Sequence, residues 1–433
     1  MPSSHLSAIV IGAGNRGTNY SLYAKDYPEK LKIVAIAEPK SFPRERLRKL
    51  FNIPSELCFS DWTDIIKLGK IADIAIIATN DTLHKDPAIA AARLKYHILL
   101  EKPMAVTVKD CIEIEKVCRE NEVILAVCHV LRYLPPVLAI KKCIEDGVIG
   151  EVVNIQHAEH VGFWHFAHSF VRGNWRNSEE SSFSLMTKCG HDVDLIKYWM
   201  GDKKCKKISS FGSLYHFQGK NKPKNSGKNC LECDIEDTCP YSAKKIYLDT
   251  FKNGNDVRWP HSVVCEPGEN FKERLEEKLL NGPYGRCVYS CDNDVCDNQT
   301  VQFQYEDGST ATLTMIAFTK KLCERDTKIF GTKGELSWDG NAEGPVVHFD
   351  FLTRETKNLA LDYVENGFGS LKGHGGADFY LMNSFINSIA QKQESIYTDA
   401  ADALESHLLV FAAEESRIKN EIIDYEKYKS NLK

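Results

Sequence analysis

The sequence lacks an apolar run long enough to cross a membrane, because no eighteen consecutive apolar residues occur among its 433 residues. Its first apolar run, Ala8 to Ile11, is too short for an export signal and lacks a cationic start. An excess of either charge is also missing, since 55 Lys and Arg stand against 60 Asp and Glu, for a net charge of −5. Such a balance does not favour nucleic acid or an anionic membrane as a partner. We therefore expect a cytoplasmic protein that binds neither.

No internal repeat is present, and hydrophobic residues (43%) and charged residues (27%) occur at the frequencies of ordinary globular proteins. These features exclude collagen, disordered tails and small secreted proteins stapled by disulfides. A chain of this length can bury a large core and, at roughly 150 residues per domain, suggests two or three domains. The fifteen cysteines are therefore expected to be reduced, and most of them to be small buried side chains.

The first 130 residues alternate short, continuous apolar runs with helix-length segments. Continuous apolar runs are typical of strands buried on both faces, and repeated strand–helix–strand units form a parallel sheet covered by helices. We predict a doubly wound α/β domain over residues 1–130. Its strands are expected at Ser7–Ile11, Lys32–Ala37, Ala72–Ala78, His97–Leu100 and Val123–Val127, and its helices at Gly14–Tyr27, Pro43–Phe51, Asp61–Leu68, Leu83–Leu94 and Val108–Asn121, the last capped by Thr107.

The pattern changes beyond about residue 150, where several predicted strands alternate apolar and polar residues. Alternation indicates a sheet with one covered and one exposed face. We predict a second α/β domain over residues 131–433, with a large, mostly antiparallel sheet and an exposed loop at Gln218–Asn229. Its strands are expected at Glu151–His160, Ile208–Phe217, Gln299–Glu306, Thr310–Phe318, Asp326–Phe330, Gly334–Asp339 and Val346–Leu352, and its helices at Asp192–Met200, Gly375–Gln391 and Thr398–Lys419.

A glycine-rich loop follows the first predicted strand. Gly12, Gly14 and Gly17 have the spacing G-x-G-x-x-G, with Asn15 and Arg16 between the last two glycines. The first glycine allows a tight turn, the second lets the backbone approach a pyrophosphate, and the third lets helix and strand pack closely. The N-terminus of the next helix then faces the phosphates. The alternative is a glycine turn with a purely structural role.

An acidic residue stands where the adenosine ribose of a dinucleotide is expected. Glu38 ends the second predicted strand, 21 residues after Gly17, and a carboxylate there binds the ribose hydroxyls. It also repels the 2′-phosphate of NADP, which favours NAD as the cofactor. Lys40, Arg44 and Arg46 follow closely and keep NADP possible, unless they are only solvated residues at the start of a helix.

The glycine loop is one of several motifs spread along the chain. The others are Thr79-Asn80 before His84, Glu101-Lys102-Pro103 after the fourth predicted strand, Arg132-Tyr133-Leu134-Pro135, Gly190-His191-Asp192-Val193-Asp194, and Ile329-Phe330-Gly331-Thr332-Lys333-Gly334-Glu335-Leu336. Together these motifs resemble those of the glucose–fructose oxidoreductase / inositol dehydrogenase (Gfo/Idh/MocA) family. The resemblance covers nearly the whole chain.

The resemblance implies a nicotinamide-dependent oxidoreductase that acts on a sugar or cyclitol. It also implies a dinucleotide-binding Rossmann domain followed by an α/β domain, whose open sheet mediates homo-oligomer formation. The cofactor is then expected to contact Gly12, Gly14, Asn15, Arg16, Gly17, Glu38, Thr79, Asn80, His84, Glu101 and Lys102, and the substrate to contact Arg132, Tyr133, Thr187 and His191.

Family members commonly use the lysine of the Glu-Lys-Pro motif and a histidine, with an aspartate four residues before that histidine. These positions are Lys102, His191 and Thr187 here, so the aspartate is replaced, and Lys188 lies beside the replacement. Histidine suits the role of base because its pKa lies near physiological pH, and a cationic lysine stabilises a developing alkoxide. Without the aspartate, either His191 is oriented differently or Lys188 shares its role. A structural His191 and a surface Lys102 are the alternatives.

Aromatic and basic side chains are concentrated in the segment Gly162–Asn177. In carbohydrate sites, aromatic faces contact sugar C–H surfaces and polar side chains contact the hydroxyls, so we expect Trp175 and Arg176 to line the substrate pocket. An aromatic core loop is the alternative. His374, in a glycine-rich turn before a predicted helix, is a candidate to reach the same site.

Three cysteines, Cys230, Cys233 and Cys239, follow the exposed loop at Gln218–Asn229. C-x-x-C is a spacing typical of zinc ligands. A structural zinc needs a fourth ligand, and an iron–sulfur cluster needs a fourth thiolate. Free or redox-linked thiols are the alternative. A second pair, Cys287 and Cys291, is better explained by core packing. Candidates for the fourth zinc ligand are Cys265, His216 and His261.

Two other functions stay open. Some members of the family hold NAD tightly and oxidise a substrate transiently while they cleave a glycosidic bond, with no net reduction of the cofactor. The other is a nucleotide-binding sensor without activity. The replacement of the aspartate by Thr187 supports a sensor, whereas Lys102 and His191 argue against it.

Overall fold

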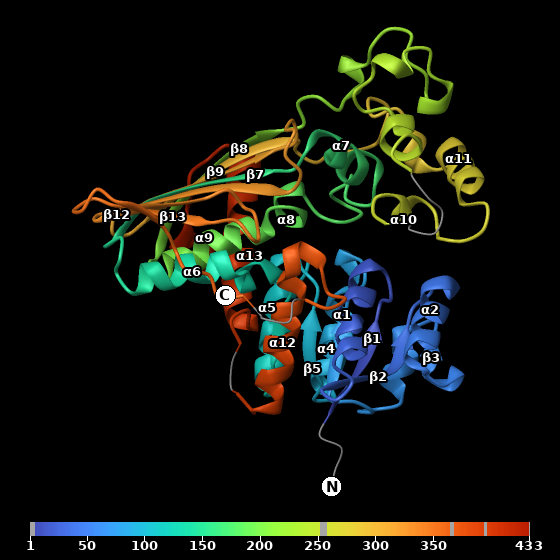
Figure 1. Cartoon of the computed structure of the whole chain (residues 1–433), viewed down its shortest axis with the longest axis horizontal. Coiled ribbons are helices and arrows are strands. Elements are labelled where there is room, and N and C mark those ends of the chain that lie inside the picture. Colours follow the sequence, from blue (N-terminus) through green and yellow to red (C-terminus); the bar gives the residue numbers. More distant parts are fainter. Residues whose placement is uncertain (1–4, 252–257, 364–367, 394–395, 433) are drawn as a thin grey trace.

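A computed structural model describes residues 5–251, 258–363, 368–393 and 396–432, which form two sheets (Figure 1). The first sheet has six strands in the order β3-β2-β1-β4-β5-β6, and the second has nine in the order β14-β13-β12-β11-β7-β10-β9-β8-β15. The predicted fold class, a Rossmann sheet followed by an α/β domain with a mostly antiparallel sheet, is confirmed.

All pairings in the first sheet are parallel. The five predicted strands are confirmed, and the added strand β3 is too short for its pattern to be seen in the sequence. The predicted cap also forms, because Thr107 Oγ1 accepts a hydrogen bond from the Asp110 amide at 3.1 Å. The strands are β1 (Leu6–Ile11), β2 (Leu31–Ala37), β3 (Cys58–Phe59), β4 (Ile74–Ile77), β5 (His97–Leu100) and β6 (Leu125–Val127), and the helices are α1 (Asn15–Asp26), α2 (Ser41–Phe51), α3 (Trp62–Lys67), α4 (Lys85–Arg93) and α5 (Val108–Glu120).

The strand order reverses between β1 and β4, which lie side by side. In open α/β sheets, ligands bind beyond the carboxyl ends of the strands at such a switch point. The glycine loop follows β1, Thr79 follows β4, and the Glu101-Lys102-Pro103 motif follows β5. The fold therefore gathers the three N-terminal motifs at one edge of the sheet.

The second sheet pairs β7 with β10 in parallel, and its other neighbours are antiparallel. Three helices, α6 (Pro135–Glu145), α9 (Gly190–Met200) and α13 (Ala400–Lys419), lie between it and the first sheet (Figure 1). Its far face carries exposed side chains such as Phe211, so the predicted alternation is confirmed; assembly through this face stays a prediction. The strands are β7 (Val152–His160), β8 (Cys205–Ser213), β9 (Asn298–Tyr305), β10 (Thr310–Ile316), β11 (Glu324–Gly331), β12 (Gly334–Trp338), β13 (Val346–Asp350), β14 (Thr356–Asn358) and β15 (Ile423–Asp424).

A separate lobe is formed by the chain between β8 and β9, together with the short helix α7 (Phe163–Phe166) (Figure 1). It contains α10 (His261–Val264) and α11 (Phe271–Asn281). Its own core is small, with buried side chains that include Tyr247 and Leu275. Most of the lobe is irregular, which agrees with the exposed loop predicted at its start.

The C-terminal helices return to the first domain. Helix α12 (Ala377–Ala390) packs on α1, and α13 packs on α5. The amide of Val127 donates to the carbonyl of Thr398 at 3.0 Å, so the chain before α13 extends the edge of the first sheet. The two domains are thus joined by packing as well as by the chain that links them. Within the described ranges, no helix has both the length and the apolar character of a membrane span.

Candidate active site

The glycine loop has the shape that a dinucleotide phosphate requires. Gly12 has a φ of +90°, and a side chain there would meet the Ala78 carbonyl oxygen at 2.5 Å. A Cβ at Gly17 would meet the Gly12 carbonyl oxygen at 1.9 Å, so helix α1 and the loop pack too closely for any other residue. A Cβ at Gly14, in contrast, would find no atom within 4 Å. Packing therefore explains Gly12 and Gly17, whereas Gly14 leaves open space at the N-terminus of α1 for a ligand.

The carboxylate of Glu38 lies beside this loop. Its two oxygens accept hydrogen bonds from the amides of Ala13 (2.8 Å) and Lys40 (2.9 Å). The side chain is buried, so it ties the end of β2 to the glycine loop. Arg44 donates to the Glu38 carbonyl, and Arg46 donates to Thr18 Oγ1 at 2.8 Å. Both guanidinium groups are thus already bound to protein atoms, whereas the binding of a 2′-phosphate would need them to be free.

Arg16 joins the glycine loop to two distant segments. Its guanidinium forms ion pairs with Glu101 at 2.6 Å and with Asp378 of α12 at 2.7 Å. Tyr20 also donates to Glu101, at 2.8 Å. Asn15, next to Arg16, is exposed at the start of α1. The sequence analysis did not name Asp378, although it named His374, whose Nδ1 lies 3.0 Å from Asp378 Oδ1, as a candidate to reach the site.

His84 holds the second and third motifs together. It is fully buried, with Nδ1 at 2.7 Å from the Pro103 carbonyl oxygen and Nε2 at 3.2 Å from the Thr79 carbonyl oxygen. Thr79 Oγ1 donates to the Leu83 carbonyl at 3.1 Å, and Asn80 is exposed. These residues therefore fix the loop edge that a cofactor would contact.

Lys102 connects the two domains at this edge. Its Nζ donates a 2.5 Å hydrogen bond to the main-chain carbonyl of Thr187, at the end of the short helix α8 (Ser184–Thr187). Burial lowers the pKa of Lys102, and the Lys188 ammonium acts in the same direction, while Glu101 opposes them. The position that carries an aspartate in similar sequences therefore contributes a main-chain oxygen here.

His191 lies in the first turn of α9 and is only 6% exposed. Its ring is 5.9 Å from that of His129 and 5.8 Å from that of His374, between ring centroids. Among the described residues, Nδ1 of His191 has no hydrogen-bond partner. Burial, and then the Lys102 cation, lower the pKa of His191 well below its usual value. The ring is therefore neutral near pH 7, with one nitrogen free to accept a proton.

Lys188 is held in a buried network of charges. It forms an ion pair with Glu159 at 2.8 Å and lies 3.1 Å from the Cys323 sulfur. Arg325 pairs with Glu159 at 2.8 Å and with Asp192 at 2.9 Å. Burial alone would lower the pKa of Lys188, but Cys323 and Glu159 outweigh it and raise that pKa. A paired ammonium is a fixed cation, which departs from the expectation that Lys188 shares the proton transfer.

The sequence analysis missed Glu159 and Cys323. A signal for Glu159 does exist: it takes an inward-facing position of β7, on the same side as Ile155 and His157, where an apolar residue is expected. A charged side chain at an inward strand position needs a buried partner. Cys323 had no such signal, because it lies in a loop between β10 and β11.

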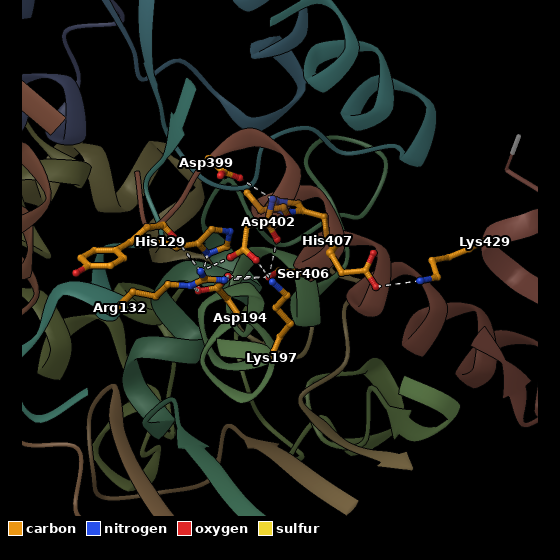
Figure 2. Close-up of polar contacts among 12 residues, drawn as sticks. His129, Arg132, Asp194, Lys197, Asp399, Asp402, Ser406, His407 and Lys429 are labelled. Atoms are coloured by element: carbon orange, nitrogen blue, oxygen red, sulfur yellow. Dashed lines mark hydrogen bonds and ion pairs between the residues drawn. The ribbon is translucent and has the colours of Figure 1, made fainter. Parts of the chain in front are cut away.

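Arg132 and Tyr133 are buried away from the edge of the first sheet where the three N-terminal motifs gather. Figure 2 shows Arg132 pointing at Asp194, with which it forms an ion pair at 2.6 Å, and at Asp402. Tyr133 shares a hydrogen bond with Thr398 at 3.1 Å. Arg132 is 2% exposed, so protein partners surround the guanidinium that the resemblance assigned to substrate.

Trp175 and Arg176 take different positions. Trp175 Nε1 donates to Asp81 at 3.0 Å, which connects the aromatic segment to the chain after β4. Arg176 lies at the surface and pairs with Asp292 at 3.0 Å and Glu180 at 2.8 Å. The structure thus brings Trp175 to the side of the site that faces Asn80, and leaves Arg176 at the rim of the lobe.

The three cysteines of the predicted zinc site, Cys230, Cys233 and Cys239, line one cavity in the lobe. Over the part of the chain that the structure describes, no three His, Cys, Asp or Glu side chains converge as a single metal ion requires. The candidate fourth ligands lie elsewhere: His216 shares a hydrogen bond with Tyr289, and His261 contacts the Tyr247 carbonyl. Cys265 donates to the Glu266 carbonyl. A zinc ion at these three cysteines therefore stays a prediction.

Two family models match the chain. Residues 6–129 match the "Oxidoreductase family, NAD-binding Rossmann fold", and residues 141–423 match the "Oxidoreductase family, C-terminal alpha/beta domain". These are the two halves of the Gfo/Idh/MocA family, and together they cover most of the chain.

Several curated proteins are similar in sequence. A putative oxidoreductase, YteT of Bacillus subtilis, is 24% identical over 363 residues, which is 81% of this chain and 80% of that protein. A 2,7-anhydro-N-acetylneuraminate hydratase of Escherichia coli is 29% identical over 195 residues, 45% of this chain and 49% of that protein. A levoglucosan dehydrogenase of Pseudarthrobacter phenanthrenivorans is 28% identical over 207 residues, 46% of this chain and 52% of that protein.

Solved structures share the fold. A levoglucosan dehydrogenase in complex with NADH and levoglucosan superposes with a TM-score of 0.71 at 18% identity, over 97% of this chain and 99% of that chain. An oxidoreductase from Agrobacterium radiobacter in complex with NAD+, L-tartaric acid and magnesium gives a TM-score of 0.68 at 17% identity, over 98% and 99%.

Proposed function

The chain belongs to the Gfo/Idh/MocA family of oxidoreductases, and from this premise we propose that it oxidises a secondary alcohol of a sugar or cyclitol with NAD, or runs the reverse reduction. One observation carries the proposal. Lys102 from the first domain and the buried, neutral His191 from the second lie at the junction where the dinucleotide loop ends. A cation and a proton acceptor are the two groups that such an oxidation needs from the protein.

The glycine loop and Glu38 fit a bound dinucleotide, which supplies the hydride acceptor at C4 of its nicotinamide. His191 accepts the hydroxyl proton through a ring nitrogen. The Lys102 ammonium stabilises the oxygen from which that proton leaves. The Thr187 carbonyl orients Lys102 by accepting its hydrogen bond, so a main-chain group takes the place of the aspartate. This arrangement supports the proposed activity in a chain that has Thr187 at the position of that aspartate.

We assign the cofactor as NAD because Glu38 is buried next to the glycine loop, where a second phosphate would be repelled. For the substrate, we keep Trp175 as a contact from the aromatic segment and place Arg176 at the outer rim. Arg132 pairs with Asp194 of α9 and Tyr133 shares a hydrogen bond with Thr398, so neither is assigned a contact with substrate.

The test is the appearance of reduced nicotinamide absorbance when NAD is mixed with a panel of sugars, cyclitols and anhydrosugars. A rise with one compound identifies the substrate class. NADP at the same concentration is the control for cofactor choice, and we expect a slower rise with it. If no compound gives a rise while calorimetry shows that NAD binds, the dehydrogenase proposal fails.

A second function is favoured by the similarity to 2,7-anhydro-N-acetylneuraminate hydratases, one of them 29% identical over 195 residues. A hydratase adds water and yields no free reduced cofactor. Product analysis of the same panel by mass spectrometry separates the two functions. A product that forms from a glycoside or anhydrosugar without any change in nicotinamide absorbance would favour transient oxidation, and the same pair of residues would serve it.

A further inference from the structure

We propose that the lobe holds an iron–sulfur cluster bound by the thiolates of Cys230, Cys233, Cys239 and Cys287. All four cysteines line a single cavity that opens to solvent. Three of them come from one stretch of ten residues, and the fourth comes from a segment nearly fifty residues later. Four cysteines are the usual ligand set of such clusters.

The fourth cysteine is brought in by a local pairing of two segments. The Cys287 amide donates to the Lys228 carbonyl at 2.9 Å, and Asn229 forms an antiparallel bridge with Arg286. This pairing sets Cys287 next to Cys230. The sequence alone does not reveal this pairing, because the two segments are separated by far more residues than the cysteines of a compact metal-binding motif.

The arrangement suits a cluster better than a single ion. In a zinc site, Zn–S bonds of about 2.3 Å draw all four sulfurs around one point. Within the described residues the thiols of the lobe do not converge in that way, whereas all four cysteines line a common cavity. A cluster with several iron atoms binds each thiolate to a different iron, so its ligands stand around a hollow of this kind.

The charges around the cavity are also those that a cluster needs. Arg172 lines the cavity, is only 1% exposed, and donates from Nη2 to the Cys230 sulfur at 3.2 Å. Its Nη1 has no hydrogen-bond partner among the described residues. The Gly227 amide points at the Cys233 sulfur, 3.3 Å away. Four thiolates leave a cluster negatively charged, and a buried cation with N–H donors to sulfur stabilises that charge.

The cluster would have a structural role in the lobe. The buried core of the lobe is small and the surrounding chain is largely irregular. Small units of this kind are commonly stabilised by disulfides or by a metal, and all fifteen cysteines are free thiols in the structure. The cavity is distinct from the edge where Lys102 and His191 meet, since none of the residues that line it belongs to that site.

The first test is the metal content of the whole protein, purified without oxygen and without chelator. We expect iron and acid-labile sulfide in equal amounts, near four of each per chain for a cubane cluster, and a broad visible absorbance that dithionite bleaches. One equivalent of zinc, or less than about a tenth of an equivalent of iron, would overturn the proposal. This test is independent of substrate and of NAD turnover, so it can fail while the proposed oxidoreductase activity stands.

Variants then identify the ligands. Cys287→Ser should lose the iron and the visible absorbance. Cys291→Ser is the matched control, because this thiol lies four residues further on, donates to the Cys287 carbonyl at 3.4 Å, and does not line the cavity. Equal iron in the two variants would remove Cys287 from the site. If Cys287→Ser does not fold, the metal content of the unaltered protein still decides the proposal.

Discussion

Lys102 forms a direct hydrogen bond between the two domains. It follows β5 in the first domain, and it hydrogen-bonds to Thr187 in the second. Its ammonium also helps to keep His191 neutral, because a nearby cation lowers the pKa of an imidazole. In the proposed mechanism, one side chain thus both stabilises a developing oxyanion and keeps the base unprotonated.

We predict that Lys102→Ala lowers kcat by ~10²–10³-fold, the usual effect of removing one electrostatic donor from a site. The binding of NAD should stay measurable by calorimetry, because the Lys102 ammonium bonds to Thr187 in the second domain, whereas Glu38 is held at the glycine loop by the Ala13 amide. Lys85→Ala is the matched control: Lys85 is a surface lysine of α4 that pairs with Asp110, and its loss should leave kcat unchanged. Equal kcat in the two variants would remove Lys102 from the mechanism.

The residues of the site could be predicted to the extent that each belongs to a local motif. The glycine loop, Glu38, Lys102 and His191 have fixed spacings relative to strands and helices, so the sequence shows them. Asp378 and Cys323 reach the site through tertiary packing; the sequence analysis named only a neighbour of Asp378, His374, as a candidate for the site. The sequence analysis did not foresee the buried ion pairs of Arg132 for the same reason, since its carboxylate partners are 62 and 270 residues away.

Helix α9 is the element that carries His191, and buried ion pairs hold it on two sides. Asp192 contacts Arg325 at 2.9 Å and His157 at 3.0 Å, on the side of the second sheet. Asp194 contacts Arg132 at 2.6 Å and accepts from Ser406 at 2.7 Å, on the side of α13 (Figure 2). Anchors on both sides fix the first turn of the helix, and with it the histidine.

Removal of one anchor should therefore destabilise the protein. We predict that Arg132→Met lowers the free energy of unfolding by roughly 3–5 kcal/mol, because it leaves the buried Asp194 carboxylate without its partner. Arg176→Met is the control. Its ion pairs lie at the surface, where such pairs contribute about 1 kcal/mol or less. Denaturant titration of both variants measures the difference.

The same pair of variants separates two roles for Arg132. If Arg132 only contacts substrate, its substitution would raise KM and leave the unfolding midpoint unchanged. If Arg132 positions α9, its substitution should shift the unfolding midpoint strongly. An unchanged midpoint in Arg132→Met would restore the substrate contact that the sequence analysis assigned.

Among the elements, most long ones with a clear apolar pattern were predicted, but the helices α6 and α11, each of 11 residues, were missed, and the three-residue strand β6 was found. Strand β5 was predicted at its observed residues, and β10 and α13 began within two residues of the observed start. Strands β3, β14 and β15 have only two or three residues, too few for any periodicity. Apart from α11, most of the lobe is irregular, which is why its cysteines stood out in the sequence while their arrangement did not.

The whole molecule buries an unusual set of neutral histidines. Burial lowers the pKa of His129 to about 3, of His168 to about 3 and of His407 to about 4. They lie in different parts of the structure: His129 and His407 stand near the domain junction (Figure 2), and His168 belongs to the lobe, where it contacts Tyr247. Their effect on stability is therefore distributed over the molecule.

These histidines should make the fold sensitive to mild acid. In the unfolded chain each has a pKa of about 6.5, so above that pH neither state binds the proton. As the pH falls below about 6.5, the unfolded state binds protons that the folded state refuses, and stability falls by roughly 1 kcal/mol per histidine per pH unit until the folded pKa is reached. Buried carboxylates such as Asp194 have lowered pKa values, so their loss begins only below pH ~4. Between pH 6.5 and 4 the histidines dominate.

We therefore predict that the melting temperature falls steadily from pH 7 to pH 5, and calorimetry in buffers of equal ionic strength measures it. His129→Phe is the informative variant, because among the described residues both ring nitrogens of His129 lack hydrogen-bond partners, so a ring without them should be accommodated. It removes one of the acid-sensitive groups, so its melting temperature should fall less steeply with pH than that of the unaltered protein. Two results would contradict the argument: a flat profile in the unaltered protein, or the same slope in His129→Phe, which would mean that other groups set the acid limit of this fold.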